Sequence, residues 1–242
     1  MRATTTPPPA SRAVDPAGVR AMFERIAPRY DALNRLLSAG IDRRWRRLAV
    51  DALAPRDGAR YLDCCAGTLD LAAAISARAP RATVVAADFA LPMLLRGRRK
   101  ALAAPGAVFP LVADALRLPF PNQTFAGATI AFGLRNLSDP AAGLAELARV
   151  LAPAARLVVL EFTTPPQPVI RAVYHAYFHH VLPRIGALVS GDGEAYRYLP
   201  DSVAAFPDVR RLGQLCVAAG FRQVQWRLLT GGIAALHTAI RR

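Results

Sequence analysis

Residues 59–79 read ARYLDCCAGTLDLAAAISARA, and this stretch decides the fold class. An apolar strand predicted at Ala59–Asp63 leads into a loop of small residues, and a helix predicted at Leu71–Ala79 follows. The same order continues along the chain, with strands predicted at 82–87, 108–112, 126–132 and 156–162 and helices at 91–103 and 140–151. Apolar strands that alternate with helices are typical of a parallel sheet covered by helices on both faces.

The C-terminal part of the chain departs from this alternation. Residues 165–205 are rich in aromatic side chains and interrupted by proline, which predicts a helical insertion or lid. A helix predicted at 209–219 ends before Gly220, and two strands follow at 224–229 and 233–240. These two strands would add an antiparallel hairpin to the parallel sheet.

The N-terminal part precedes the predicted sheet. Residues 1–17 are rich in proline and lack the apolar segment of a secretory signal, so we expect a disordered lead-in. Residues 18–53 have apolar side chains at helical spacing. The sequence therefore predicts a single α/β domain over residues 18–242, in which N-terminal helices and a lid flank the sheet.

The formal net charge of +14 on 242 residues admits nucleic acid, an anionic membrane surface or an acidic small molecule as a partner. Lys100 is the only lysine, so nearly all of the positive charge reflects an arginine-rich composition. Two local clusters, at residues 43–47 and 96–100, fit either a solvated helix face or contact with an anionic membrane. No window has the roughly 18 uninterrupted apolar residues of a membrane helix, and the cysteines lack the spacing of a zinc site.

Acidic side chains follow three successive predicted strands. Asp63 ends the first strand, Asp88 follows the second, and Asp114 lies just beyond the third. Parallel strands bind ligands beyond their carboxyl ends, where Asp88 could accept two ribose hydroxyls and Asp114 would lie beside an adenine. The loop at residues 66–70 lacks the glycine pattern that binds a dinucleotide pyrophosphate. A nucleoside that carries an amino acid and no phosphate fits this loop better.

Two further motifs, with several shorter stretches, are more distinctive than the strand-end acids. Residues 132–136 read FGLRN, and residues 30–34 read YDALN. Together with stretches around residues 37–45, 118–122, 149–162, 181–186, 196–199 and 219–221, they resemble the ubiquinone/menaquinone biosynthesis C-methyltransferases. The resemblance extends from about residue 19 to the end of the chain. It implies a Rossmann-like, seven-stranded class I methyltransferase sheet with S-adenosylmethionine as cofactor.

The resemblance also implies roles for individual residues. Cofactor contacts are expected at Thr68, Asp88, Asp114, Ala115 and Ala131, and the same predicted site includes Asp63 and Gly67. The residues expected nearest the reacting ring are Arg135, Asn136 and Tyr30. A fixed guanidinium at Arg135 would stabilise a developing phenolate and orient a water molecule as proton acceptor, without a metal.

The implied substrate is a prenylated quinol, and the sequence leaves open whether it is demethylmenaquinol or a polyprenyl benzoquinol. Because an isoprenoid tail resides in the bilayer, we expect a cytoplasmic enzyme in peripheral contact with the inner face of the membrane. The predicted lid and the N-terminal helices would form its apolar entrance. We expect no nucleic-acid partner, and a homo-oligomer is compatible with the sequence.

Four positions depart from the family pattern. Leu69 and the turn at residues 153–155 replace glycines, Asp42 replaces a histidine, and Ala131 replaces a serine. If the glycine at position 69 needs a positive φ angle, leucine would be strained there. Leu69 and the lost glycines favour one alternative, an accessory protein with impaired catalysis that binds quinone intermediates. The positive charge alone favours another, an RNA methyltransferase.

Overall fold

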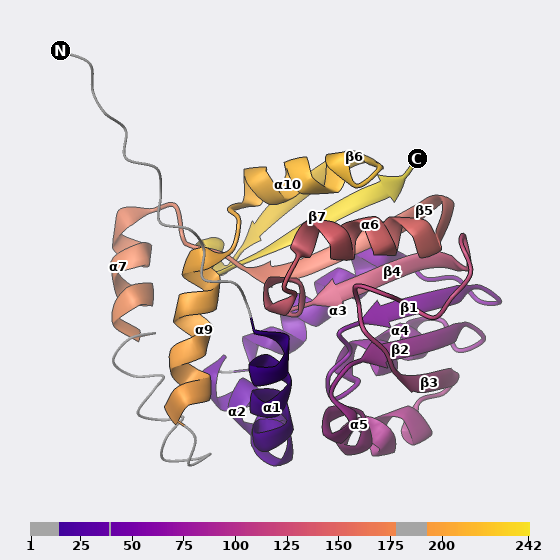
Figure 1. The fold of residues 1–242 in the computed structure, drawn as a ribbon, viewed down its shortest axis with the longest axis horizontal. Coiled ribbons are helices and arrows are strands. Elements are labelled where there is room, and N and C mark those ends of the chain that lie inside the picture. The colour runs from indigo at the N-terminus through magenta and orange to yellow at the C-terminus, as the bar shows by residue number, and fades with distance from the viewer. Residues whose placement is uncertain (1–14, 39, 178–192) are drawn as a thin grey trace.

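The computed structural model describes residues 15–38, 40–177 and 193–242, and it confirms the predicted α/β class (Figure 1). Seven strands form one sheet in the order β3-β2-β1-β4-β5-β7-β6. They are β1 (Arg60–Cys64), β2 (Thr83–Asp88), β3 (Ala107–Val112), β4 (Phe125–Ala131), β5 (Leu151–Phe162), β6 (Phe221–Leu229) and β7 (Ala234–Arg241). The first five strands are parallel, and β7 pairs antiparallel with both β5 and β6, as the predicted hairpin requires.

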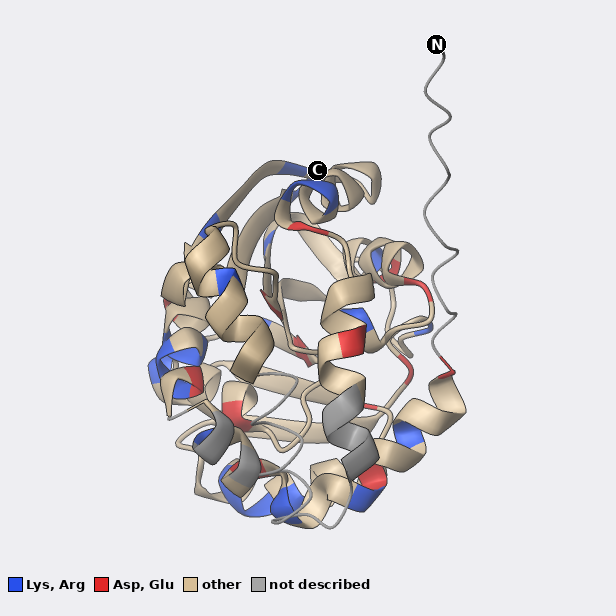
Figure 2. Ribbon diagram, turned by 90° about the vertical axis from the view of Figure 1, so that its left-hand side faces the viewer, with Lys and Arg blue, Asp and Glu red and all other residues tan. Residues whose placement is uncertain are grey.

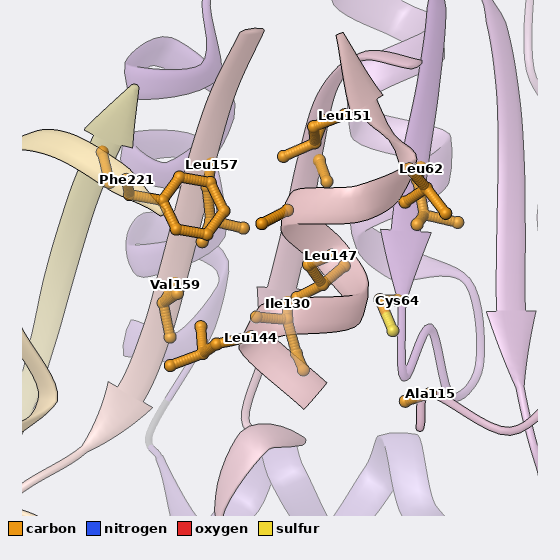
Figure 3. Packing of buried hydrophobic residues seen from close by; sticks show 14 of the residues in the cluster. Leu62, Cys64, Ala115, Ile130, Leu144, Leu147, Leu151, Leu157, Val159 and Phe221 are labelled. Carbon is orange, nitrogen blue, oxygen red and sulfur yellow. The ribbon is translucent and has the colours of Figure 1, made fainter. Parts of the chain in front are cut away.

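Helices cover both faces of the sheet because the strands are apolar on both faces. One face carries α3 (Ile41–Leu53), α4 (Asp70–Arg78) and α5 (Leu91–Ala103). The other carries α6 (Pro140–Val150) and α10 (Val209–Ala218). In Figure 3, Leu144 and Leu147 of α6 pack on strand residues of this second face, and all of these side chains are almost fully buried.

The remaining helices gather at the carboxyl end of the parallel strands, on the left in Figure 1. They are α1 (Pro16–Ile26), α2 (Tyr30–Leu37), α7 (Pro168–Ala176) and α9 (Gly193–Ala205). The Asp15 carboxylate caps α1 by accepting hydrogen bonds from the amides of Ala17 and Gly18, at 3.1 Å each. Residues 16 and 17, which we expected in the lead-in, therefore begin a helix, whereas residues 1–14 and the middle of the predicted lid lie outside the described residues.

Strand β5 begins five residues earlier than the sequence predicts. Its partner β4 pairs Phe125 with Leu151 and Gly127 with Arg156, so the intervening residues of β5 form a bulge. Ala154 lies in this bulge with a φ angle of 63°. The sequence at residues 153–155 is typical of a turn, which is why the prediction placed the strand boundary after it.

Leu69 has the positive φ angle, 67°, that we considered for this position, and it therefore carries backbone strain. Its side chain is fully buried in the core between the sheet and the helices α3, α4 and α5. Gly97 of α5 lies directly against it, because a Cβ atom at Gly97 would come within 2.5 Å of the Leu69 Cγ atom. The leucine therefore contributes core packing that a glycine could not supply.

Ala154 and Leu69 both have a left-handed backbone conformation, but substitution by glycine should change the stability of the protein in opposite directions at the two positions. Ala154 is exposed, so Ala154→Gly removes strain without loss of packing and should raise the free energy of unfolding by about 1 kcal/mol. Leu69→Gly removes a similar strain but also a buried side chain, whose loss costs about 3–5 kcal/mol, so this variant should be less stable than the wild type. Chemical denaturation of both variants measures the difference, and a stabilised Leu69→Gly protein would contradict the packing role.

Candidate active site

A cavity opens at the carboxyl end of the parallel strands. Its walls come from α1, α2 and the loops that follow β1, β2, β3 and β4. A smaller cavity adjoins it and extends toward α3 and the start of α4. We call them the main cavity and the side cavity, and both are lined by Tyr30, Cys65, Gly67, Ala131 and Phe132.

Asp88 ends β2 and lines the main cavity, as predicted for a strand-end acid. One carboxylate oxygen accepts a hydrogen bond from the amide of Gly67 at 2.8 Å, and the other accepts from the amide of Ala90 at 2.9 Å. Burial raises the pKa of Asp88 above its ordinary value, although these two bonds oppose the shift. The carboxylate is therefore held in a fixed orientation, with acceptor capacity left for a ligand.

Asp63 lies in β1 and lines the side cavity. Its Oδ1 atom accepts a hydrogen bond from Thr129 at 2.8 Å, whereas its buried Oδ2 atom has no hydrogen-bond partner among the described residues. Burial raises the pKa of Asp63 to about 7. A buried acceptor without a partner is costly, so this atom points to a ligand that donates to it.

The other predicted cofactor residues also surround these cavities. Asp114 and Ala115, just past β3, line the main cavity, and Leu116 donates its amide to the Asp114 carboxylate at 2.9 Å. Gly67 and Ala131 line both cavities. Thr68 lines the side cavity, but its hydroxyl is already bonded to two charged side chains from α2 and α5.

Two of the three residues predicted near a reacting ring line the main cavity, Tyr30 and Asn136. Burial raises the pKa of the Tyr30 hydroxyl, partly offset by a hydrogen bond with Asn34 and by the positive charges of Arg46 and Arg135. The Asn136 amide is oriented from two sides. Its oxygen accepts a hydrogen bond from the Tyr198 hydroxyl of α9 at 3.1 Å, and its nitrogen donates to the carbonyl of Phe132 at 3.2 Å.

Arg135, the third of these residues, lines neither cavity. Its Nη1 atom forms a buried ion pair with Glu161 at 2.6 Å and also donates to the carbonyl of Phe132. Its guanidinium lies 5.3 Å from the ring centroid of Phe162. Arg135 therefore joins the loop after β4 to the end of β5, which is a structural role.

Gly133, in the same loop, has an ordinary backbone conformation with a φ angle of −114°, so this position does not need glycine for a positive φ angle. A Cβ atom at this position would come within 2.3 Å of the Cβ atom of Cys65. Glycine is needed because the loops after β1 and β4 pack directly on each other. That contact brings residues of both loops into the two cavities.

Three polar residues near the side cavity were missed from the sequence. Arg46 lines this cavity and pairs with Asp42, and Asp31 and Lys100 bond to Thr68. Helical spacing gives one signal for Arg46, because it lies four residues after Asp42 on the buried side of α3. The contact between Asp31 and Lys100 depends on tertiary packing, which the sequence alone does not reveal.

Among the described residues, no cluster of three or more His, Cys, Asp and Glu side chains could hold a metal ion. Over the same residues, no helix has the length and apolarity needed to cross a bilayer. Three histidines lie close together in the sequence: His175 is an exposed residue of α7, whereas His179 and His180 lie outside the described residues.

Comparison with known families gives a match over residues 11–241 to the model of the ubiE/COQ5 methyltransferase family. A demethylmenaquinone methyltransferase from Thermus thermophilus is 55% identical over 220 residues, which cover 91% of this chain and 100% of the relative. A protein from Syntrophotalea carbinolica, named ubiquinone/menaquinone biosynthesis C-methyltransferase UbiE, is 50% identical over 92% of this chain and 93% of its own length.

Solved structures agree on the fold. A SAM-dependent methyltransferase from Thermotoga maritima superposes with a TM-score of 0.64 at 16% identity, over 93% of this chain and 100% of that chain. At this identity the likeness concerns architecture alone. It confirms the predicted class I methyltransferase sheet with its antiparallel C-terminal strands.

The buried pair of Arg135 and Glu161 gives a stability prediction. Arg135→Met leaves the Glu161 carboxylate buried without its partner, which should cost about 3–5 kcal/mol and lower the melting temperature by roughly 10 °C. Adding Glu161→Gln removes the uncompensated charge and keeps one acceptor oxygen, for the amide of either Arg135 or Phe162, so the double variant should recover most of the loss. Thermal melts of the three proteins measure this, and an additive double variant would contradict the pairing.

Proposed function

The chain belongs to the ubiE/COQ5 methyltransferase family and is a C-methyltransferase of quinone biosynthesis; we propose that its two cavities bind S-adenosylmethionine and a prenylated quinol side by side. The observation that carries this proposal is the convergence of Asp63, Asp88 and Asp114 on adjoining cavities at the carboxyl ends of three parallel strands.

The polar groups of these cavities match the parts of S-adenosylmethionine. Asp88 is oriented to accept the two ribose hydroxyls, and Asp114 and Ala115 lie where the adenine would extend toward β3. The methionine end then reaches the side cavity. There the unpartnered oxygen of Asp63 would accept from the ammonium group, and the Arg46 guanidinium would bind the carboxylate.

S-adenosylmethionine supplies an activated methyl group on a sulfonium sulfur. The protein's task is to align a ring carbon with that methyl group, exclude water and stabilise the phenolate that forms as the quinol loses a proton. Tyr30 and Asn136 line the main cavity, where each can hold a ring oxygen. The Arg135 charge already lowers the pKa of Tyr30, so its field reaches the same place and would favour a phenolate there.

We propose demethylmenaquinol, a naphthoquinol, as the substrate in preference to a benzoquinol. The support is that the relative with 55% identity over its full length is named for demethylmenaquinone. An accessory role without catalysis is less well supported, because Leu69, the departure that suggested it, packs in the core and lines neither cavity.

We also propose peripheral contact with an anionic bilayer, through the outer face of α5. Leu91, Leu95 and Leu102 are 46%, 58% and 75% exposed and follow one stripe of this helix. Arg96, Arg98 and Arg99 are exposed on the same helix, which lies at the lower edge of the molecule in Figure 1, and Figure 2 shows basic segments at several margins of the molecule, including the lower one. Exposed leucine beside arginine suits the boundary between acyl chains and phosphates.

The direct test combines product analysis with one substitution. The wild type should convert a prenylated naphthoquinol to its C-methylated product faster than a prenylated benzoquinol, as measured by mass spectrometry. Asp88→Asn keeps an acceptor oxygen for only one of the two loop amides and loses charge-assisted bonds to the ribose, so calorimetry should show S-adenosylmethionine binding about a hundredfold more weakly. An unchanged affinity would remove Asp88 from the site.

The raised pKa of Asp63 predicts a pH dependence of cofactor binding. If the ligand ammonium pairs with the ionised carboxylate, the apparent affinity should rise about eightfold between pH 6 and pH 7.5, as the carboxyl with a pKa of about 7 loses its proton. Asp63→Asn should bind more weakly and lose this dependence. A wild-type affinity that is flat over this range would show that the ligand does not contact the carboxylate.

Vesicle flotation tests the membrane contact. Leu95→Ser combined with Leu102→Ser should reduce flotation with phosphatidylglycerol vesicles several-fold. Its matched control is Val217→Ser on α10, an apolar side chain that is also about half exposed, at 45%. Equal flotation of the wild type and the leucine variant would overturn the assignment of α5.

A further inference from the structure

Lys100 forms the centre of a polar cluster that joins four parts of the chain. Its Nζ atom lies 2.7 Å from Asp31 of α2, 2.7 Å from Asp70 at the start of α4, and 3.1 Å from the Thr68 hydroxyl in the loop after β1. Thr68 in turn donates its hydroxyl to Asp31. Three of the four side chains are less than a quarter exposed or buried outright, so solvent screens these contacts only in part.

The backbone around the cluster explains how Lys100 reaches it. Gly97 lies one turn earlier on α5, and a Cβ atom there would come within 2.6 Å of the Thr68 carbonyl oxygen. The absence of a side chain lets α5 lie directly against the loop that lines both cavities. Lys100, three residues further on, then extends over Thr68 toward Asp31.

The acceptors around position 100 match the ammonium group of a lysine better than the guanidinium group of an arginine. Lys100 is the only lysine among 31 lysine and arginine residues, in a chain that uses arginine everywhere else. Its three acceptors surround a single nitrogen atom, and an ammonium group directs three hydrogens from one point. A planar guanidinium spreads its donors over three nitrogen atoms and does not match this arrangement.

Asp31 connects the cluster to the site, because it adjoins Tyr30, whose side chain lines both cavities. Burial would raise the pKa of Asp31, but hydrogen bonds from Lys100 and Thr68 hold it below its ordinary value. The Asp31 carboxylate is therefore charged and paired while α2 lies against the loop. Separation of α2 from the loop would break these contacts together.

We propose that Lys100 is a positioning residue: its ammonium clamps α2 to the loop after β1, and so fixes Tyr30 and Thr68 around the methionine end of the bound cofactor. This inference rests on the proposed function, since the loop is taken to hold S-adenosylmethionine. Lys100 itself lines neither cavity and acts through Asp31, Thr68 and Asp70. Without the clamp, α2 leaves the site more often, and the cofactor is released faster.

The experiment compares Lys100→Met, Lys100→Arg and a matched control. Arg81→Met is the control, because it breaks the exposed ion pair of Arg81 with Asp57, at 3.1 Å, away from both cavities. Measurements are the melting temperature, the dissociation rate of S-adenosylmethionine, kcat and KM for the quinol, and hydrogen exchange of residues 30–37 with cofactor bound. The wild type is assayed first, so failure to bind the cofactor or to methylate counts against the proposed function alone.

We expect both Lys100 variants to release the cofactor roughly tenfold faster, to lose a similar factor in kcat, and to exchange faster at residues 30–37, whereas Arg81→Met behaves as wild type. Wild-type release and exchange in Lys100→Met, or full rescue by Lys100→Arg, would overturn the clamp. If Lys100→Met does not fold, Asp31→Asn weakens the same contact from α2 and should show the same changes. Unaltered release in Asp31→Asn would equally overturn it.

Discussion

Parallel pairing of β1 with β2 and β4 is the constraint on which the site depends. Because the strands run in one direction, their carboxyl ends meet at one edge, and the loops that follow must crowd together there. The contact of Gly133 with Cys65 and that of Gly97 with Thr68 show how closely these segments approach. Two buried carboxylates, Asp63 and Asp88, can be held at this edge only because backbone amides and Thr129 donate to them.

Around this edge the protein divides its charged groups between two tasks. The Arg135–Glu161 pair is buried and joins β4 to β5, so it maintains the shape of the wall on one side of the main cavity. The Lys100 cluster and the Arg46–Asp42 pair maintain the other side, where α2 and α3 meet the loop after β1. Few of these charges face the main cavity itself, which suits an apolar ring carrying an isoprenoid tail.

The sequence was sufficient to predict the sheet and to place acidic residues at the ends of its first strands, where they line the two cavities, because these features follow from apolar strands and the residues at their ends. Asp63, Asp88 and Asp114 illustrate this, since their positions depend on local order along the chain. Contacts between distant segments could not be predicted in the same way. The pairing of Arg135, the reason for Gly133 and the meeting of Asp31 with Lys100 all depend on how loops and helices pack. Leu69 shows a third case, in which a strained backbone was foreseen but the buried direction of its side chain was not.

The single lysine has a consequence for chemistry on the protein. Apart from the N-terminus, Lys100 is the one amine in the chain that an acylating reagent could modify. Its side chain is only 23% exposed. Its contacts with Asp31, Asp70 and Thr68 also enclose the nitrogen, so a reagent reaches it poorly while the cluster is intact. A labelling reaction at Lys100 would therefore report, at one atom, how often the N-terminal helices separate from the sheet.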